Sequence, residues 1–375
     1  MKDNPLRELG TLGQSVWLDY IRRDLITGGE LRRLIDEDGL RGITSNPAIF
    51  EKAIAESNLY NGDISAMASE GKGVKTIYEA LSLGDVQRAA NEFRPVYHRT
   101  DGKDGYVSLE VNPHLAHDTN GTVEEARRLW KDLNRLNVFI KVPATVEGLP
   151  AIQQLITEGI NVNVTLLFGL PRYRQVAEAY LAGIEKRVAQ GESVKSVASV
   201  ASFFLSRIDT LLDPLLEKLL LQGGARAELA KKARGNVAIA SAKMAYQDYK
   251  TLFQSDRFLQ LAAHGANVQR LLWASTSTKN PLYRDVKYVE PLIGPNTVNT
   301  MPLETLNAYR DHGDPQVLLE QDVEDARLVL DRLPELEIDI DKVTQQLEDE
   351  GIVKFNTPFD QLMEAIGNRI TGRSP

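Results

Sequence analysis

The stretch VFIKVP, residues 138–143, decides the fold because it has the pattern of a buried strand that carries one charged side chain. Side chains alternate between the two faces of a strand, so Val138, Ile140 and Val142 share one face, opposite Phe139 and Lys141. A buried amine is expensive, by several kilocalories per mole even after the surroundings relax. A lysine in such a strand therefore indicates a polar interior that serves a purpose.

Seven further short runs, apolar or β-branched, have the same character and bring the number of expected strands to eight. They are Ser15–Ile21, Gly42–Pro47, Tyr106–Asn112, Asn161–Phe168, Val197–Phe204, Arg270–Thr276 and Thr297–Met301. Helical patterns separate them. Repeated strand–helix alternation favours an α/β fold in the form of a closed parallel (β/α)8 TIM barrel. A doubly wound sheet stays open as an alternative, because alternation alone does not show closure.

Helices are expected between and after the strands. The spacing of Thr122 and Glu125 predicts a capping box that opens a helix towards Arg135. Other predicted helices are Pro150–Glu158, Ser206–Leu221 with a break at Pro214 left open, Arg226–Gln247, two or three within residues 48–105, Val317–Leu333, Ile340–Glu350 and Pro358–Ile370. We expect one domain over residues 1–375, in which about 303–375 form a helical carboxyl-terminal extension.

Composition narrows the class of protein. The chain has 375 residues, of which 42% are hydrophobic and 26% charged, as in a globular protein with a large core. Its net charge of -8 argues against binding to nucleic acid or to an anionic membrane, since both require a basic face. It has no cysteine, which excludes disulfides, thiolate nucleophiles and cysteine-ligated metals. The polar first residues and the lack of long apolar runs lead us to expect a cytoplasmic protein.

Four polar residues interrupt the strands at inward-facing positions. If the apolar parity of each strand faces the helices, then Asp19, Glu110, Lys141 and Thr165 point into the barrel near its carboxyl end, where barrel enzymes place their chemistry. The set is either a structural ion cluster or an active site. We favour the active site, because a cluster built only for stability gains little over apolar packing.

Chemistry suggests a task for such a set. A lysine in a partly desolvated barrel favours its neutral amine, which can attack a ketone to form an imine. The protonated imine draws electrons from the neighbouring carbon–carbon bond. A carboxylate must then accept and return a hydroxyl proton, while another group positions water. Asp19, Glu110 and Thr165 can supply those roles.

Six ordered motifs each place a polar residue at a strand end, namely WLDY, GITSNP, SLEVNP, FIKVPAT, NVTLLF and SVASFFLSRID. Together they resemble transaldolases over nearly the whole chain, and WASTSTKNP and IGPNTVNTMP resemble the longer bacterial branch of that family. The resemblance implies transfer of a dihydroxyacetone unit between sugar phosphates in the non-oxidative pentose phosphate pathway. It also implies that neither a metal nor an organic cofactor is needed.

The resemblance assigns roles to individual residues. Lys141 is similar to the Schiff-base lysine, and Asp19 to the acid/base of carbon–carbon cleavage. Glu110 and Thr165 resemble the pair that holds the catalytic water. The implied substrate-binding residues are Asn46, Ser202, Phe204, Arg207 and Ser275. Asn46, which precedes a proline, also has the pattern of simple turn chemistry.

One position departs from the family pattern. Shorter transaldolases carry an arginine two residues beyond the serine that matches Ser275, but here that position is Ser277. Lys279 is a nearby candidate for the missing cation. A helix that begins near Ser206 could also offer backbone N–H groups to a phosphate. The sequence does not decide between them.

Two other functions stay open. A fructose 6-phosphate aldolase would release dihydroxyacetone to water, although Glu110 weighs against it because that branch replaces the water-holding carboxylate. A non-catalytic barrel that binds sugar phosphates is the second alternative. His114 and His117 form an H-x-x-H pair without the motif of a metal site, so we expect no metal there. Monomer or homodimer stays undecided.

Overall fold

The computed structural model describes residues 4–371. Eight strands form a closed barrel in chain order, and every neighbouring pair is parallel. The strands are β1 Gln14–Asp19, β2 Gly42–Thr44, β3 Tyr106–Glu110, β4 Val138–Pro143, β5 Val162–Leu167, β6 Ser199–Phe204, β7 Arg270–Ala274 and β8 Thr297–Met301. Because β1 pairs with both β2 and β8, the barrel is confirmed and a doubly wound sheet is excluded.

Each of the eight predicted runs overlaps one of these strands. The predicted and observed ends agree within three residues, and the largest difference is at β2, which ends at Thr44. The run ends early there because Asn46 caps the next helix, with Ile49 N donating to its side chain at 3.0 Å. An N-cap residue cannot at the same time continue a strand ladder.

Aromatic rings fill the amino-terminal part of the barrel interior. The ring of Phe139 stacks on Tyr106 with centroids 4.3 Å apart and on Trp17 at 6.0 Å. Gly42 lies beside them, where a Cβ atom would come within 2.6 Å of Trp17. These residues share the inward parity of Asp19, Glu110 and Lys141. A buried ion pair between Arg270 and Asp104, at 2.9 Å, lies at the same end, where Asp104 also accepts from the Trp17 indole.

Helices surround the barrel and extend beyond it. In chain order they are α1 Pro5–Thr11, α2 Arg23–Thr27, α3 Glu30–Glu37, α4 Pro47–Ala55, α5 Asn61–Ser69, α6 Val74–Arg99, α7 Thr119–Leu133, α8 Gly148–Thr157, α9 Leu170–Ala189, α10 Ser206–Gln222, α11 Gly224–Ala233, α12 Val237–Phe253, α13 Asp256–Ala263, α14 Leu303–His312, α15 Val323–Asp331 and α16 Ile340–Ile370. Three short 3-10 helices are η1 Pro113–Leu115, η2 Glu290–Leu292 and η3 Leu333–Leu336. No helix within residues 4–371 is long and apolar enough to cross a membrane.

The predicted capping box is wrong. Helix α7 begins at Thr119, and its N-cap is Asp118, whose carboxylate accepts from Gly121 N at 2.9 Å. Thr122 lies inside the helix, where its hydroxyl donates to the carbonyl of Leu115. The Glu125 carboxylate accepts from the backbone N–H of Asn112. Asp118 is an equally good cap residue, so the local pattern alone selected the wrong start.

The predicted helix Arg226–Gln247 is two helices, α11 and α12. They are separated at Gly235, which has a positive φ of 71°. A Cβ atom there would lie 2.5 Å from the hydroxyl of Tyr283. The chain turns at Gly235 because glycine accepts this backbone conformation and because the neighbouring loop packs against it.

The tail also differs from the prediction. Helix α15 begins at Val323, six residues later than expected, and Ile340–Glu350 and Pro358–Ile370 are one continuous helix, α16. Pro358 lies inside α16 without ending it. The buried side chains of Phe355 and Phe359 pack on both sides of the proline, so tertiary contacts outweigh its helix-breaking tendency.

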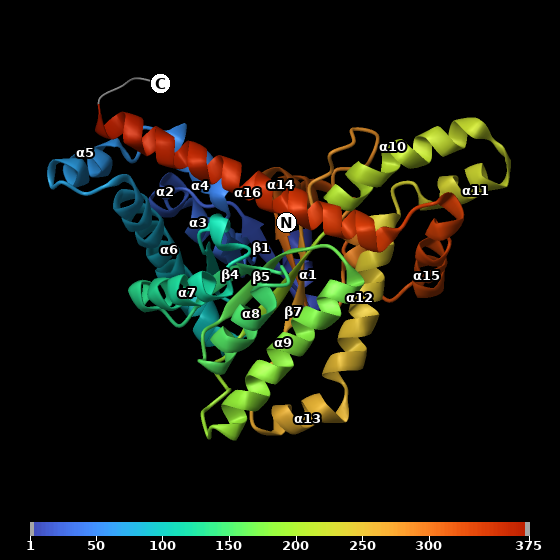
Figure 1. Cartoon of the computed structure of the whole chain (residues 1–375), viewed down its shortest axis with the longest axis horizontal. Helices are drawn as coiled ribbons and strands as arrows, with labels where there is room; N and C mark the ends of the chain where they lie inside the picture. The colour runs from blue at the N-terminus through green and yellow to red at the C-terminus, as the bar shows by residue number, and fades with distance from the viewer. Residues whose placement is uncertain (1–3, 372–375) are drawn as a thin grey trace.

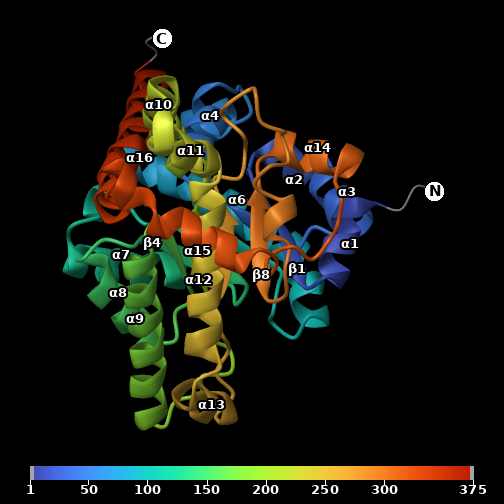
Figure 2. The same ribbon diagram turned by 90° about the vertical axis from the view of Figure 1, so that its right-hand side faces the viewer.

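Helix α16 crosses the carboxyl-terminal mouth of the barrel, as the long red helix of Figure 1 shows. It packs on α4, α5, α6, α10 and the end of β5. Figure 2 shows the opposite end of the molecule, where α9 and α12 run side by side down to α13. The single-domain boundary stays a prediction, and its outermost residues, 1–3 and 372–375, lie outside the described residues.

Candidate active site

A buried lysine occupies the centre of the barrel mouth. Lys141 is only 4% exposed, and its Nζ donates to the backbone carbonyl of Ser45 at 2.9 Å. Glu110 is its neighbour in register on β3, and Glu110 Oε2 lies 3.4 Å from Nζ. This distance suits an ion pair and is too long for a strong hydrogen bond. The amine therefore makes one hydrogen bond, to the Ser45 carbonyl, and one longer electrostatic contact, with the Glu110 carboxyl group.

Glu110 is a carboxyl group poised to change its charge. Both of its oxygens are buried and have no hydrogen-bonding partner among the described residues. Burial raises the pKa of Glu110 to about 7, although Lys141 opposes that shift. The group can therefore hold a proton or release it near neutral pH, which suits a residue that manages water.

Asp19, at the end of β1, is the second acid. Its carboxylate accepts a hydrogen bond of 2.6 Å from Thr44, whose hydroxyl also lies 2.7 Å from that of Thr300. Asp19 keeps part of its surface open to the barrel mouth, yet protein atoms surround it closely. Desolvation therefore raises its pKa, while Lys141 and Thr44 pull the pKa down. A raised pKa suits a group that must accept and return a proton.

A chain of hydrogen bonds lies beneath the lysine. Asn163 donates to the hydroxyl of Ser108 at 3.1 Å and accepts from Ser202 at 2.6 Å. On the same face of β5, the buried hydroxyl of Thr165 has no partner within residues 4–371. The ladder between β5 and β6 is irregular from Val164 to Leu167, and this irregularity accompanies the end of the strand near Thr165.

The cation expected for a phosphate lies at the start of α10. The guanidinium carbon of Arg207 is 5.5 Å from the centroid of the Phe204 ring, and its Nη1 is buried without a partner within the described chain. Burial lowers the pKa of Arg207, whereas Asp19 raises it. An arginine stays charged under such a shift, so it is available to an anion.

Two serines face each other beside Arg207. The hydroxyls of Ser206 and Ser275 are 2.9 Å apart, and Ser206 N donates to the carbonyl of Ser275 at 3.1 Å. Ser275 has a φ of 55°, an uncommon conformation for a residue other than glycine. Such backbone strain persists only where the surroundings hold it, which is frequent at ligand sites.

Lys279 lies further along the same loop. Its Nζ donates to the hydroxyl of Ser277 at 2.6 Å, so the residue at the departing position holds this lysine. Lys279 also lines a pocket of about 150 Å³ with Asp209 and Asp213 of α10. Its contact with a phosphate stays a prediction, as does the contact of Asn46 with substrate hydroxyls.

Several residues at the site were missed by sequence reasoning. The carbonyl of Ser45 has no side-chain signal at all, since any residue could supply it. Thr44 and Thr300 lie at strand ends and could have been found by their parity. Phe355, from α16, lies with its ring centroid 5.9 Å from Lys141 Nζ, and nothing in its local sequence places it there.

The histidine pair has separate partners. His114 lies 2.8 Å from the Asp360 carboxylate of α16, and His117 lies 3.1 Å from Glu147. Within residues 4–371, no group of three or more metal-binding side chains is assembled.

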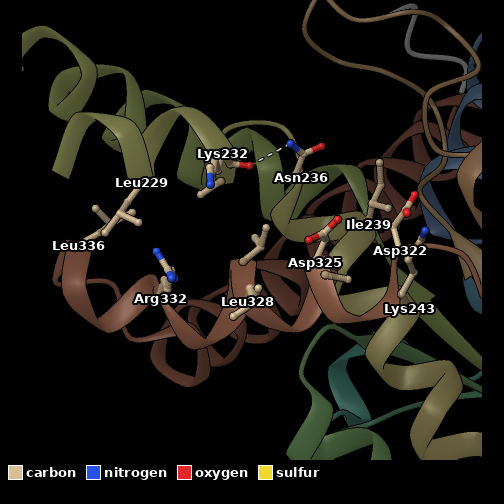
Figure 3. Close-up of a pocket in the computed structure, with 14 residues that line it drawn as sticks. Leu229, Lys232, Asn236, Ile239, Lys243, Asp322, Asp325, Leu328, Arg332 and Leu336 are labelled. Carbon is tan, nitrogen blue, oxygen red and sulfur yellow. Dashed lines mark hydrogen bonds between the residues drawn. The ribbon is translucent and has the colours of Figure 1, made fainter. Parts of the chain in front are cut away.

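A pocket of about 480 Å³ lies away from the barrel, between α11, α12 and α15 (Figure 3). Leu229 and Leu336 line one end, and Lys232 of α11 and Arg332 lie beside them. None of the predicted site residues lines it. We therefore do not assign the active site to this pocket, although it is larger than the other pockets described, and we keep the assignment to the barrel mouth.

The fold and the mouth together define a class of enzyme. A closed parallel barrel with a buried lysine between two acids of raised pKa has the parts that imine-forming aldol chemistry requires. The chain belongs to the transaldolase/fructose-6-phosphate aldolase family, whose model matches residues 16–366.

Individual relatives match the chain over 96–100% of its length. A protein of Trichodesmium erythraeum named transaldolase is 49% identical over 100% of both chains. A transaldolase of Thiobacillus denitrificans is 46% identical over 97% of this chain and 100% of its own. A transaldolase of Mycobacterium tuberculosis is 44% identical over 96% of each.

Proposed function

We propose that this chain is a transferase that catalyses the transaldolase reaction through an imine on Lys141. It takes a dihydroxyacetone unit from fructose 6-phosphate or sedoheptulose 7-phosphate. The acceptor is erythrose 4-phosphate or glyceraldehyde 3-phosphate. The single observation that supports this most is the lysine amine buried at the barrel mouth within 3.4 Å of a carboxyl group.

The reaction would begin with attack of the Lys141 amine on the ketone carbon of the donor. Loss of water leaves a protonated imine, which accepts the electron pair when the bond between the third and fourth carbons breaks. Asp19 takes the proton from the hydroxyl on the fourth carbon, and an aldose phosphate leaves. Lys141 then holds the three-carbon unit as an enamine.

Transfer reverses these steps with a second aldose. The enamine carbon attacks the aldehyde of the acceptor, and Asp19 returns the proton to the new hydroxyl group. Water that Glu110 and Thr165 hold then hydrolyses the imine. The unpaired oxygens of Glu110 and the unpaired hydroxyl of Thr165 support this role, because buried polar groups require a partner. The proposal requires neither a metal nor an organic cofactor.

The phosphate would bind at the start of α10. Arg207 supplies the charge, while Ser206, Ser275 and the first N–H groups of the helix supply further donors. In the proposed pose Ser202 and Phe204 line the sugar, and Lys279 replaces the arginine absent at Ser277. We place the enzyme in the cytoplasm as part of the same proposal.

A fructose 6-phosphate aldolase is the second candidate, since the family includes both activities. The presence of Glu110 beside Lys141 favours transfer. So do the names of the relatives at 44–49% identity. Release of free dihydroxyacetone should therefore be slow and should fall further when erythrose 4-phosphate is added.

The test traps the intermediate. With fructose 6-phosphate and borohydride, peptide mapping should find one adduct, on Lys141, and Lys141→Met should abolish it and lower kcat/KM on the order of 10⁴-fold or more. Asp19→Ala should still form adduct but cleave about 10²–10⁴-fold more slowly. The control is Lys243→Met, because Lys243 is also buried but lies on α12.

Two results would contradict the proposal. If Lys141→Met kept its adduct, the nucleophile would be another residue. If Asp19→Ala turned over at the normal rate, the acid/base would be another group. Binding of fructose 6-phosphate without adduct or turnover in the unaltered protein would instead support a non-catalytic barrel.

A further inference from the structure

Helix α16 places an aromatic ring over the lysine. Phe355 is 4% exposed, and its ring centroid lies 5.9 Å from Lys141 Nζ. One turn earlier on the same helix, Gly351 faces Leu166 at the end of β5. A Cβ atom at this glycine would lie 2.9 Å from Leu166 and 3.7 Å from Arg207 Nη1. The helix therefore approaches both the imine position and the phosphate position.

The groups beneath α16 are closed off from solvent. Lys141, Glu110 and Thr165 are 4%, 7% and 0% exposed. The Glu110 oxygens and the Thr165 hydroxyl have no partner among residues 4–371. Buried polar groups without partners are costly, so these groups suit a polar ligand or an ordered water that pairs with them.

Contacts at several points along α16 hold the helix in place over the barrel mouth. Near the start of α16, Glu348 lies 3.3 Å from Arg172, and both side chains are largely buried. Near its end, Arg369 donates to the carbonyls of Ile54 and Ala55 at 2.7 Å each. Between them, the ring of Phe359 packs edge-on against a tyrosine of α6. These contacts fix the backbone of α16, and with it the position of the Phe355 Cα atom, at the barrel mouth.

We propose that Phe355 is a further residue of the catalytic pocket, where it keeps bulk water from the three-carbon enamine on Lys141 and so favours transfer over hydrolysis. The proposal rests on the imine chemistry proposed above. It assigns to α16 a task that no residue of the barrel performs, since the strands enclose the lysine from below and from the sides.

The two fates of the intermediate differ in what reaches it. In transfer, the enamine carbon forms a bond to the aldehyde carbon of the acceptor, and Asp19 gives up its proton. In hydrolysis, the enamine carbon takes a proton instead, and a water molecule then adds to the imine carbon. The nitrogen–carbon bond breaks, which returns the free amine and dihydroxyacetone. An apolar cover disfavours the second route because it limits the access of bulk water, the proton source, to the enamine carbon. The water that Glu110 and Thr165 hold in the proposed mechanism still hydrolyses the imine of the new ketose.

The test compares two matched variants, Phe355→Leu and Phe359→Leu. Both change a buried phenylalanine of α16, 4% and 7% exposed, but only Phe355 lies over the lysine. Release of dihydroxyacetone from fructose 6-phosphate alone is measured against transfer to erythrose 4-phosphate. The ratio of hydrolysis to transfer should rise about tenfold or more in Phe355→Leu and stay within about twofold of the unaltered protein in Phe359→Leu.

A second measurement follows the intermediate directly. After mixing with fructose 6-phosphate, samples are quenched with borohydride at intervals, and the labelled fraction of Lys141 is read by mass spectrometry. The label should decline faster in Phe355→Leu than in the control. Phe355→Met, which keeps a long apolar side chain over the amine, should keep most of the unaltered ratio. If Phe355→Leu does not fold, Phe355→Val takes its place and should raise the ratio in the same direction.

Failure of this proposal is separable from failure of the proposed function. If no adduct forms on Lys141 in the unaltered protein, the imine mechanism itself is wrong. If the adduct forms normally while Phe355→Leu, or Phe355→Val in its place, keeps the unaltered ratio, the mechanism stands and the role of Phe355 is wrong. An equal rise in Phe359→Leu would also overturn it, because the effect would then belong to the helix as a whole.

Discussion

Lys141 and Lys243 are the two lysines that are buried among residues 4–371, and their surroundings differ. Lys243 lies on α12, outside the barrel, and its Nζ donates to the carbonyl of Gln321. Lys141 instead faces Glu110 and lies within electrostatic reach of Asp19. Both lysines are buried, so burial alone does not distinguish them. The two neighbouring acids distinguish Lys141, the proposed nucleophile, from Lys243, which we expect to have a structural role.

The inward positions of these residues could be predicted because strand parity is a local property. Once Val138, Ile140 and Val142 are assigned to the helix-facing side, Lys141 has to face inward. The same rule places Glu110. It does not place the Ser45 carbonyl that binds the lysine, because a backbone group leaves no mark in the sequence.

Glu110 should make stability depend on pH. The folded protein holds its proton up to about pH 7, whereas the ordinary pKa is 4.5, so between these values the folded state binds more protons than the unfolded state. The contribution of Glu110 to stability is therefore fully present below the unfolded pKa of 4.5 and is lost as the pH rises through the folded pKa of about 7. Glu110→Gln removes this contribution. The stability of the unaltered protein relative to Glu110→Gln should fall by about 2–4 kcal/mol from about pH 4.5 to about pH 7.

Urea unfolding at a series of pH values measures this difference. Glu335→Gln, at an exposed position on η3, is the control and should change nothing beyond the background. A difference between the unaltered protein and Glu110→Gln that is independent of pH would show that Glu110 does not titrate in this window.

At the scale of elements, strands were predicted well and helix limits poorly. A strand of five residues that is buried on both faces leaves a continuous apolar signature. Helix limits depend on which of several cap residues wins, as at Asp118, and on contacts made much later in the chain, as around Pro358. The separation of α11 from α12 was missed because Gly235 lies in a stretch that is otherwise strongly helical.

Gly235→Ala should destabilise the protein by about 1–3 kcal/mol, because the new side chain meets both a positive φ and the Tyr283 hydroxyl. That hydroxyl donates to Asp213 at 2.6 Å, so the clash also disturbs a hydrogen bond. The control is Gly62→Ala on α5, where a Cβ atom meets nothing within 4 Å. It should be neutral or stabilising by up to about 1 kcal/mol. Equal midpoints of urea unfolding for the two variants would contradict this account.

At the scale of the whole molecule, segments far apart in sequence are joined at Asp38. This carboxylate is 2% exposed, and it accepts two hydrogen bonds from Arg310 of α14, at 2.9 and 2.5 Å. Asn4, at the start of α1, donates to the same carboxylate at 2.8 Å. These contacts could not be predicted, because the sequence around each of the three residues does not indicate which distant residue it contacts.

Arg310→Met should lower the free energy of unfolding by about 1–3 kcal/mol, since it leaves a buried carboxylate short of partners. Arg32→Met is the matched control. Arg32 also makes two-pronged contacts, with Glu92, but its side chain is 69% exposed, and its loss should cost less than about 1 kcal/mol. Similar losses in the two variants, measured by urea unfolding, would mean that burial of Asp38 does not matter.

The position of α16 has a consequence for the protein while it is being synthesised. The ribosome makes residues 340–370 after all eight strands, so a nascent barrel can close while its amine is still open to the surrounding water. On the proposed role of Phe355, a chain that ends before α16 would still form the imine on Lys141 but would lose the three-carbon unit to water, so transfer would begin only once α16 has docked.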